Sequence, residues 1–208
     1  MGRFALRKLD SGERFVITKD NADLDKIRVE LTWQKGDLDA EAWLLNQDGL
    51  IVNDEAFVFY GSKNRTEEYD KAKFGSKKNY LAETRPMSAD GAVLGPKDEL
   101  TGGLETINIC LSKLARDVQE IVISATLYVP NDDKVETFGE VENAKITVID
   151  ENSGDPLCCY ELSREYNSED AMVACSILLN DEGEWEFEAV GKGYSGGLQT
   201  LVDIYAEE

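Results

Sequence analysis

The chain has 208 residues, of which 42 are acidic, 22 are basic and none is histidine, so its formal net charge is −20. This charge disfavours broad attraction to nucleic acid or to an anionic membrane, because phosphate groups are bound by clustered cations. The lack of histidine excludes Ser-His and Cys-His nucleophile pairs and histidine-ligated metal centres. What the acidic balance favours is solubility and the binding of cations.

No apolar run is long enough to span a bilayer, and the first ten residues hold too short an apolar stretch for a secretory signal. We therefore expect a cytoplasmic protein without a membrane span. The cysteines lie within apolar segments and lack the paired spacing of zinc ligands. We expect buried, reduced thiols at Cys110, Cys158, Cys159 and Cys175.

Alternating apolar and polar residues predict strands in the first third of the chain, over residues 13–19, 27–33 and 40–45. The alternation is cleanest in the second of these, where Ile27, Val29, Leu31 and Trp33 are expected to face a core. Residues 56–60, Ala-Phe-Val-Phe-Tyr, are dense in aromatic residues, which predicts a strand buried on both faces.

Residues 61–90 are the least regular part of the chain, and we interpret them as an insertion that leaves the core, with a hairpin as one form it could take. The insertion holds the basic cluster Lys71, Lys73, Lys77, Lys78 and Arg85. Two interpretations stay open at this point. The insertion is either a solvated loop or a contact surface for an acidic protein.

Strands resume in the second half of the chain, and they are predicted over residues 105–111, 121–129, 144–149, 156–162 and 171–179. A short helix is expected over 112–117, with Ser112 as its N-cap. The closing strand places Trp185, Phe187 and Ala189 on one face and three glutamates on the other, before a glycine-rich turn over 191–197. About ten short strands with little helix predict an all-β protein, a two-sheet β-sandwich in one domain over residues 1–208.

Two acidic segments are candidates for a metal site. Asp37 and Asp39 follow Gly36 at the start of a strand, where a period of two places both carboxylates on one face and Leu38 on the other. Two adjacent carboxylates repel each other, and a divalent cation between them would remove that cost. The alternative is a polar strand end that faces water.

The second acidic segment is the loop Gly95-Pro-Lys-Asp-Glu-Leu-Thr-Gly-Gly-Leu-Glu105. Asp98, Glu99 and Glu105 offer hard oxygen ligands on a backbone that glycines leave free to fold around an ion. Calcium accepts about six to eight such oxygens, including carbonyls and water. The spacing is not that of an EF-hand, and an ordinary acidic loop remains the alternative.

Six segments, in order, resemble the TerD family of tellurium-resistance and stress-response domains: Gly36–Leu45, Phe57–Tyr60, Leu100–Gly102, Thr137–Ala144, Tyr160–Ser163 and Trp185–Leu198. The resemblance implies a β-sandwich that binds calcium through the acidic loop. Asp98, Thr101, Gly102 and Glu105 match the family's loop, whereas Glu99 replaces an Asn and Lys97 replaces a Gly. The Gly-Asp-rich middle of the loop is absent, and the 61–90 insertion is longer than in relatives.

The leading hypothesis is a non-catalytic, calcium-binding stress-response domain with one weakened site. Its ligands would be Asp37, Asp39, Asp98, Glu99, Thr101 and Glu105. A second hypothesis is a metal-free scaffold that contacts a protein partner through the 61–90 insertion. A third is a glycosidase that uses paired carboxylates, but Trp33, Trp43 and Trp185 fall at core positions and no other feature supports it.

Overall fold

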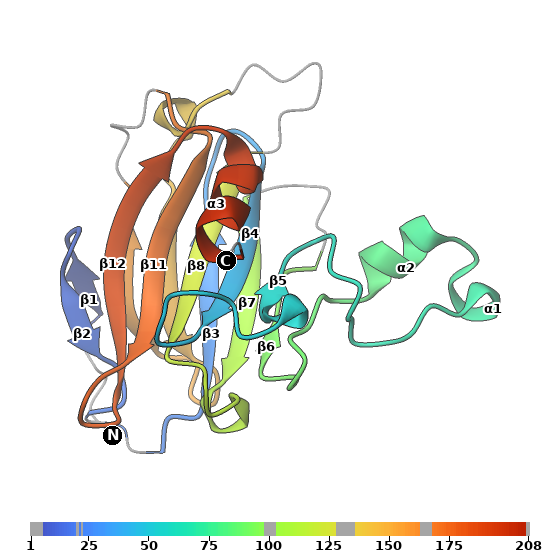
Figure 1. Cartoon of the computed structure of the whole chain (residues 1–208). Helices are drawn as coiled ribbons and strands as arrows, with labels where there is room; N and C mark the ends of the chain where they lie inside the picture. Colours follow the sequence, from blue (N-terminus) through green and yellow to red (C-terminus); the bar gives the residue numbers. More distant parts are fainter. Residues whose placement is uncertain are drawn as a thin grey trace.

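Two six-stranded sheets pack face to face in a computed structural model that describes residues 6–19, 21, 23–97, 103–127, 136–162 and 168–206 (Figure 1). The first sheet has the order β1 (Arg7–Leu9), β10 (Pro156–Glu161), β9 (Lys145–Asp150), β3 (Lys26–Thr32), β7 (Leu104–Cys110) and β6 (Val93–Leu94). The second has the order β2 (Arg14–Val16), β12 (Trp185–Tyr194), β11 (Ala171–Leu179), β8 (Glu120–Leu127), β4 (Leu38–Leu45) and β5 (Phe57–Val58). The all-β sandwich prediction is confirmed.

Neighbouring strands are antiparallel except for β1 and β10, which are parallel. Three short 3-10 turns, η1 (Asp54–Ala56), η2 (Leu111–Lys113) and η3 (Phe138–Glu140), lie in the connections. Three α-helices are present in the described residues: α1 (Lys71–Phe74), α2 (Lys77–Glu83) and α3 (Gly197–Tyr205). No helix in this part of the chain is long and apolar enough to cross a membrane.

The main core lies between the sheets. Ile27, Val29 and Leu31 of β3 are buried there, as the alternation predicts, and Phe187 and Ala189 of β12 face them from the other sheet. A smaller core lies on the outer face of the second sheet, where Leu201 of α3 packs with Trp43. Figure 1 shows α3 lying across this face. The central strands of the second sheet are therefore buried on both sides, which explains their continuous apolar runs.

The predicted strand over 56–60 is wrong in length and in burial. Only Phe57 and Val58 form β5, at the edge of the second sheet, and Tyr60 is 53% exposed. The aromatic rings form a stack at the edge of the smaller core, with the Phe57 ring 3.8 Å from that of the buried Trp43 and 4.1 Å from that of Phe59. An edge strand leaves one side of such rings open to solvent.

Two further boundaries differ from the prediction. A single 3-10 turn, η2, replaces the helix over 112–117. Its N-cap is Cys110, and Ser112 lies inside the turn, where its backbone N–H donates to Asp25 Oδ1 at 2.8 Å. At the C-terminal end, β12 runs through the first glycines to Tyr194, and α3 follows at Gly197 where only a turn was expected. Gly191 has φ +59°, and a Cβ there would collide with the Tyr160 hydroxyl, so the strand requires glycine at this point.

The 61–90 insertion is not a β-hairpin. An isolated bridge between Arg65 and Pro86 closes its base, and α1 and α2 form its tip. The Asp70 carboxylate caps α1 by accepting the N–H of Ala72 at 2.8 Å, and the Ser76 hydroxyl caps α2 in the same way. Of the cysteines, Cys158, Cys159 and Cys175 are buried and Cys110 is half-buried, all as free thiols.

Candidate metal centre

The first strand of the candidate site is β4, on which acidic and apolar residues alternate. Leu38 and Ala40 are buried in the core between the sheets, whereas Asp37 and Asp39 are half-buried. The predicted division of this segment into a carboxylate face and an apolar face is confirmed. Gly36, at φ +92°, turns the chain into the strand.

Glu41 continues the carboxylate row and is fully buried on the outer face of the second sheet. Its two oxygens accept hydrogen bonds from neighbouring β8, one from the Ser124 hydroxyl at 2.5 Å and one from the Thr126 hydroxyl at 2.6 Å. The Trp43 indole N–H donates to the same Ser124 oxygen at 2.8 Å. The carboxyl group is thus held by neutral donors, without a cation in hydrogen-bond contact among the described residues.

This environment changes the acidity of Glu41. Burial raises the pKa of the Glu41 carboxyl to about 8, the two hydroxyl donors partly oppose the rise, and the charge of Asp39 adds to it. At neutral pH the group therefore holds its proton for much of the time. A nearby positive charge would favour its ionised form.

Glu105 is the residue of the first sheet that belongs to the candidate site. It lies on β7 opposite Leu31 of β3, and its carboxylate accepts the backbone N–H of Ala40 on β4. β5 pairs only with Ala42 and Trp43, so beyond it the edge of β4 is open, and the glutamate side chain takes the place of a further strand there. This contact joins β4 and β7 at one edge of the sandwich.

The pKa of Glu105 is raised to about 9, first by burial. The hydrogen bond from Ala40 lowers the pKa, and the charges of Asp39, Glu41 and Asp37 raise it. The carboxyl groups of Asp37, Asp39 and Glu41 are therefore close enough to Glu105 to disfavour its ionisation. A pKa raised by both burial and like charges is typical of functional sites, although buried polar networks also produce it.

The structure brings together Asp37, Asp39 and Glu105 of the six predicted ligands. The other three, Asp98, Glu99 and Thr101, lie outside the described residues. Within the described residues, no group of three or more His, Cys, Asp or Glu is arranged to hold a metal ion. The described carboxylates are thus at most part of a site, and their role as ligands stays a prediction.

Sequence reasoning missed Glu41, Ser124 and Thr126. The signal for Glu41 was present, because it follows Asp37 and Asp39 at the same two-residue spacing inside an otherwise apolar run. The hydroxyls gave a weaker signal, as single polar residues in the apolar strand β8. Their pairing with Glu41 depends on strand register, which places Ser124 opposite Glu41 and Thr126 opposite Asp39.

The donor chemistry of this cluster fits a hard divalent cation. All its side-chain donors are carboxylate or hydroxyl oxygens, which suit calcium or magnesium and not zinc, for which thiolate and imidazole are the usual ligands. Burial is the main cause of the raised pKa values of Glu41 and Glu105, and the charges of neighbouring carboxylates add to it. A cation would relieve that repulsion.

The TerD domain profile matches residues 6–205. The chain belongs to the TerD family. Its relatives include the protein YceE of Bacillus subtilis strain 168, 31% identical over 95% of this chain and 96% of that protein, and General stress protein 16U of the same organism, at 27% over 95% of each. Tellurium resistance protein TerD of Serratia marcescens is 27% identical, again over 95% of each chain.

The fold also agrees with a solved structure. A homologue of telluride resistance protein (TerD) from Streptomyces coelicolor A3(2) superposes with a TM-score of 0.58 at 17% identity, covering 87% of this chain and 96% of that one. At this identity the likeness concerns the fold alone. The family membership rests on the sequence matches, and it places this TerD domain among proteins named for stress response and tellurium resistance.

Proposed function

We propose that this TerD domain is a non-catalytic, calcium-binding stress-response protein of the cytoplasm. Asp37, Asp39 and Glu105 supply carboxylate ligands, and Asp98, Glu99 and Thr101 supply the remaining protein oxygens. The names of its relatives support a role in stress response, with tellurite as one candidate stress. A bound calcium ion offsets the negative charges of these carboxylates.

The observation that carries the proposal is that the charges of Asp37 and Asp39, at the start of β4, act on Glu105 of β7 in the other sheet. They add to burial, the main cause, in raising the pKa of Glu105 to about 9. Ionised carboxylates at this edge would join β4 to β7 through a shared cation. Because the loop before Glu105 is short of carboxylates, we expect a weak site, with a dissociation constant on the order of 0.1–1 mM.

The burial of the aromatic and acidic groups supports a role without catalysis. Trp43 is fully buried and Trp33 is 5% exposed, so neither ring is available as a platform for a sugar. Glu41, the carboxyl with a pKa near neutrality, is fully buried and out of reach of a substrate. A general acid must contact the proton acceptor that it serves.

Isothermal titration with calcium tests the metal site. We expect saturable binding to the wild-type chain and at least tenfold weaker binding, a loss of about 1.4 kcal/mol, in Asp39→Asn and in Asp98→Asn. Asp48→Asn is the matched control, since it removes one carboxylate from the exposed turn after β4. Absence of calcium binding in the wild type would refute the proposal, as would equal affinities in all three variants.

A second candidate function is a protein-interaction scaffold that uses the 61–90 insertion. Its support is structural, because the insertion is a folded element with its own caps and buried side chains, including Phe74. The two functions are compatible, since the insertion and the carboxylate cluster use different residues.

A further inference from the structure

The 61–90 insertion, called the arm below, projects from the sandwich. It leaves after β5 and returns before β6, the edge strands of the two sheets on the same side. Figure 1 shows α1 and α2 at its tip, well away from both sheets. The side chains at the tip are thus presented to the surroundings of the molecule.

Arg65 organises the interior of the arm. It is 7% exposed, and its guanidinium donates to the carbonyl oxygens of Tyr60, Leu81 and Thr84 and to the Thr84 hydroxyl, at 2.7–3.0 Å. These four hydrogen bonds join the first segment of the arm, at Arg65, to the end of α2. A buried arginine with all these contacts satisfied fixes one conformation, which lowers the entropy cost of binding a partner.

Arg85 anchors the arm to the sandwich. Its guanidinium donates to the carbonyl oxygens of Gly95, Leu94 and Thr106 and to Asn108 Oδ1, at 2.7–3.0 Å. Arg85 was predicted as part of a basic surface, and the structure corrects this, because its charge is directed into the base of the arm. The four lysines remain exposed.

The arm exposes apolar surface beside those lysines. In the described part of the chain, six large apolar side chains are exposed, and three of them, Tyr60, Tyr69 and Leu81, belong to the arm or directly precede it. Tyr69, Leu81 and Lys77 line a hollow of about 590 Å³ on this surface. Apolar area next to positive charge is characteristic of a protein-binding surface.

Charge separates the tip of the arm from the body. Between Tyr69 and Leu81 the chain has four lysines and one acid, Asp70, for a net charge of +3, so the remainder of the protein carries −23. Lys73 pairs with Glu67 of the arm, so the basic surface that the tip offers to a partner is that of Lys71, Lys77 and Lys78. The tip lies away from the acidic body, so its lysines do not offset the negative charge of the body in the same molecule. Opposite potentials of this kind steer association between surfaces.

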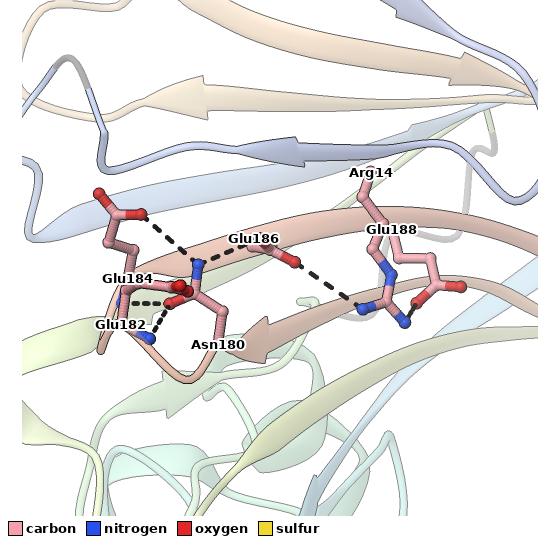
Figure 2. Close-up of polar contacts among 6 residues, drawn as sticks. All are labelled: Arg14, Asn180, Glu182, Glu184, Glu186 and Glu188. Atoms are coloured by element: carbon pink, nitrogen blue, oxygen red, sulfur yellow. Dashed lines mark hydrogen bonds and ion pairs between the residues drawn. The ribbon is translucent and has the colours of Figure 1, made fainter.

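The acidic counterpart lies at the opposite edge of the second sheet. There β12 and the turn before it present Glu182, Glu184, Glu186 and Glu188, while the arm follows β5 at the other edge. Figure 2 shows this row: the Asn180 amide contacts Glu184 and Glu186, and Arg14 pairs with Glu188 at 2.8 Å and with Glu186 at 3.8 Å. One arginine for four glutamates leaves the row negative, and Asp181 and Glu182 at the turn are exposed.

We propose that the tip of the arm docks on the β11–β12 turn of a second copy of this chain. Lys71, Lys77 and Lys78 would face Asp181, Glu182 and Glu184 of that copy, and the hollow beside Tyr69 and Leu81 would cover part of its surface. The two surfaces are different, so a one-way contact is head-to-tail and builds rings or open chains, whereas reciprocal docking of the two arms gives a closed twofold dimer.

Sedimentation velocity tests the proposal with the full-length protein. At about 20 mM NaCl we expect species larger than the 23.2 kDa monomer that grow with protein concentration, and at about 500 mM NaCl we expect the monomer, because salt screens exposed charges. Lys77→Glu/Lys78→Glu should be monomeric at both salt concentrations. The matched control, Lys113→Glu/Arg116→Glu, changes the charge by the same −4 at exposed positions of the body and should associate like the wild type.

A charge exchange makes the test specific. Asp181→Lys/Glu182→Lys should also be monomeric alone, and an equimolar mixture with Lys77→Glu/Lys78→Glu should associate, because each variant then supplies a complementary surface to the other. A wild-type protein that is monomeric at low salt would overturn the proposal, as would association that persists in the arm variant or a mixture that stays monomeric. Far-ultraviolet circular dichroism confirms that the variants fold.

The outcome is independent of the metal site. Calcium titration of Lys77→Glu/Lys78→Glu should match that of the wild type, because neither lysine belongs to the carboxylate cluster. Loss of calcium binding with retained association, or the reverse, therefore identifies which of the two proposals has failed.

Discussion

Two rows of acidic residues lie on the outer face of the same sheet with the same two-residue spacing, yet their environments are opposite. Along β4 and the residue before it, burial increases from the half-buried Asp37 and Asp39 to Glu41, which is fully buried. On β12, the Glu186 and Glu188 side chains stay 15% and 25% exposed and pair with Arg14 (Figure 2). Strand periodicity explains the common face, and the neighbours of each row explain the difference.

Other residues cover the acidic row of β4, whereas the acidic row of β12 is partly exposed to solvent. Trp43 and α3 cover the outer face beside Glu41, and β8 offers hydroxyls but no cation. β12 lies next to the edge strand β2, which supplies Arg14. The same residue type is therefore buried among neutral hydroxyl donors in one row and paired with an arginine at a partly exposed position in the other. Charge count alone does not separate them.

Of the substitutions in the two rows, removal of the Glu41 carboxyl should lower the free energy of unfolding most. Glu41→Ala leaves a cavity and takes the acceptor from two buried hydroxyls, so we expect the free energy of unfolding to fall by about 2–4 kcal/mol. Urea denaturation at pH 6 with a calcium chelator measures it. An effect below that of Glu188→Ala would mean that the Glu41 network adds nothing to stability.

The second-largest effect should be the pH dependence of stability that the buried Glu41 produces. The folded pKa of Glu41, about 8, exceeds its ordinary value of 4.5, so the folded state holds a proton that the unfolded chain releases. This contribution is complete below pH 4.5 and is lost as pH rises through 8, by about 1–3 kcal/mol near neutrality.

Chelated protein should accordingly melt at a lower temperature as pH rises from 5.5 to 9, and Glu41→Gln should show a shallower slope. The amide keeps the shape of the side chain and removes its titration. A variant whose slope equals that of the wild type would show that Glu41 is ionised in the folded protein throughout this range.

The β12 row should respond least. Arg14→Ala removes partly exposed ion pairs, so we expect a loss of at most about 1 kcal/mol. The loss should shrink in high salt, because solvent ions screen the pairs. Chemical denaturation at low and high ionic strength measures both values. A loss above 2 kcal/mol would place this row in the same class as the buried one.

Much of the sandwich could be predicted from the sequence, because period-two alternation is a local signal. It located β3 and β12 and placed Asp37 and Asp39 on one face, while a continuous apolar run located β11. The arm was harder to predict, since helices of four and seven residues are too short to show a clear apolar period. The caps at Asp70 and Ser76 are visible in the sequence, but only in retrospect.

The buried part of the carboxylate cluster was beyond sequence reasoning. Burial of Glu41 depends on β8, more than 80 residues further along the chain, and on the unpredicted helix α3. The contact of Glu105 with Ala40 depends on the edge of β4 being open. Long-range pairing decides both, whereas composition and spacing report only on neighbours in the chain.

The most direct test of the central claim is a thermal melt at pH 8 with excess calcium and with chelator, in the wild type and in Asp39→Asn. If the carboxylates of β4 and β7 share a cation, calcium at 100 times its dissociation constant should stabilise the wild type by about 2.7 kcal/mol and raise its melting temperature by several degrees. The variant should respond much less. Identical melting temperatures of the wild type with calcium and with chelator would contradict the account.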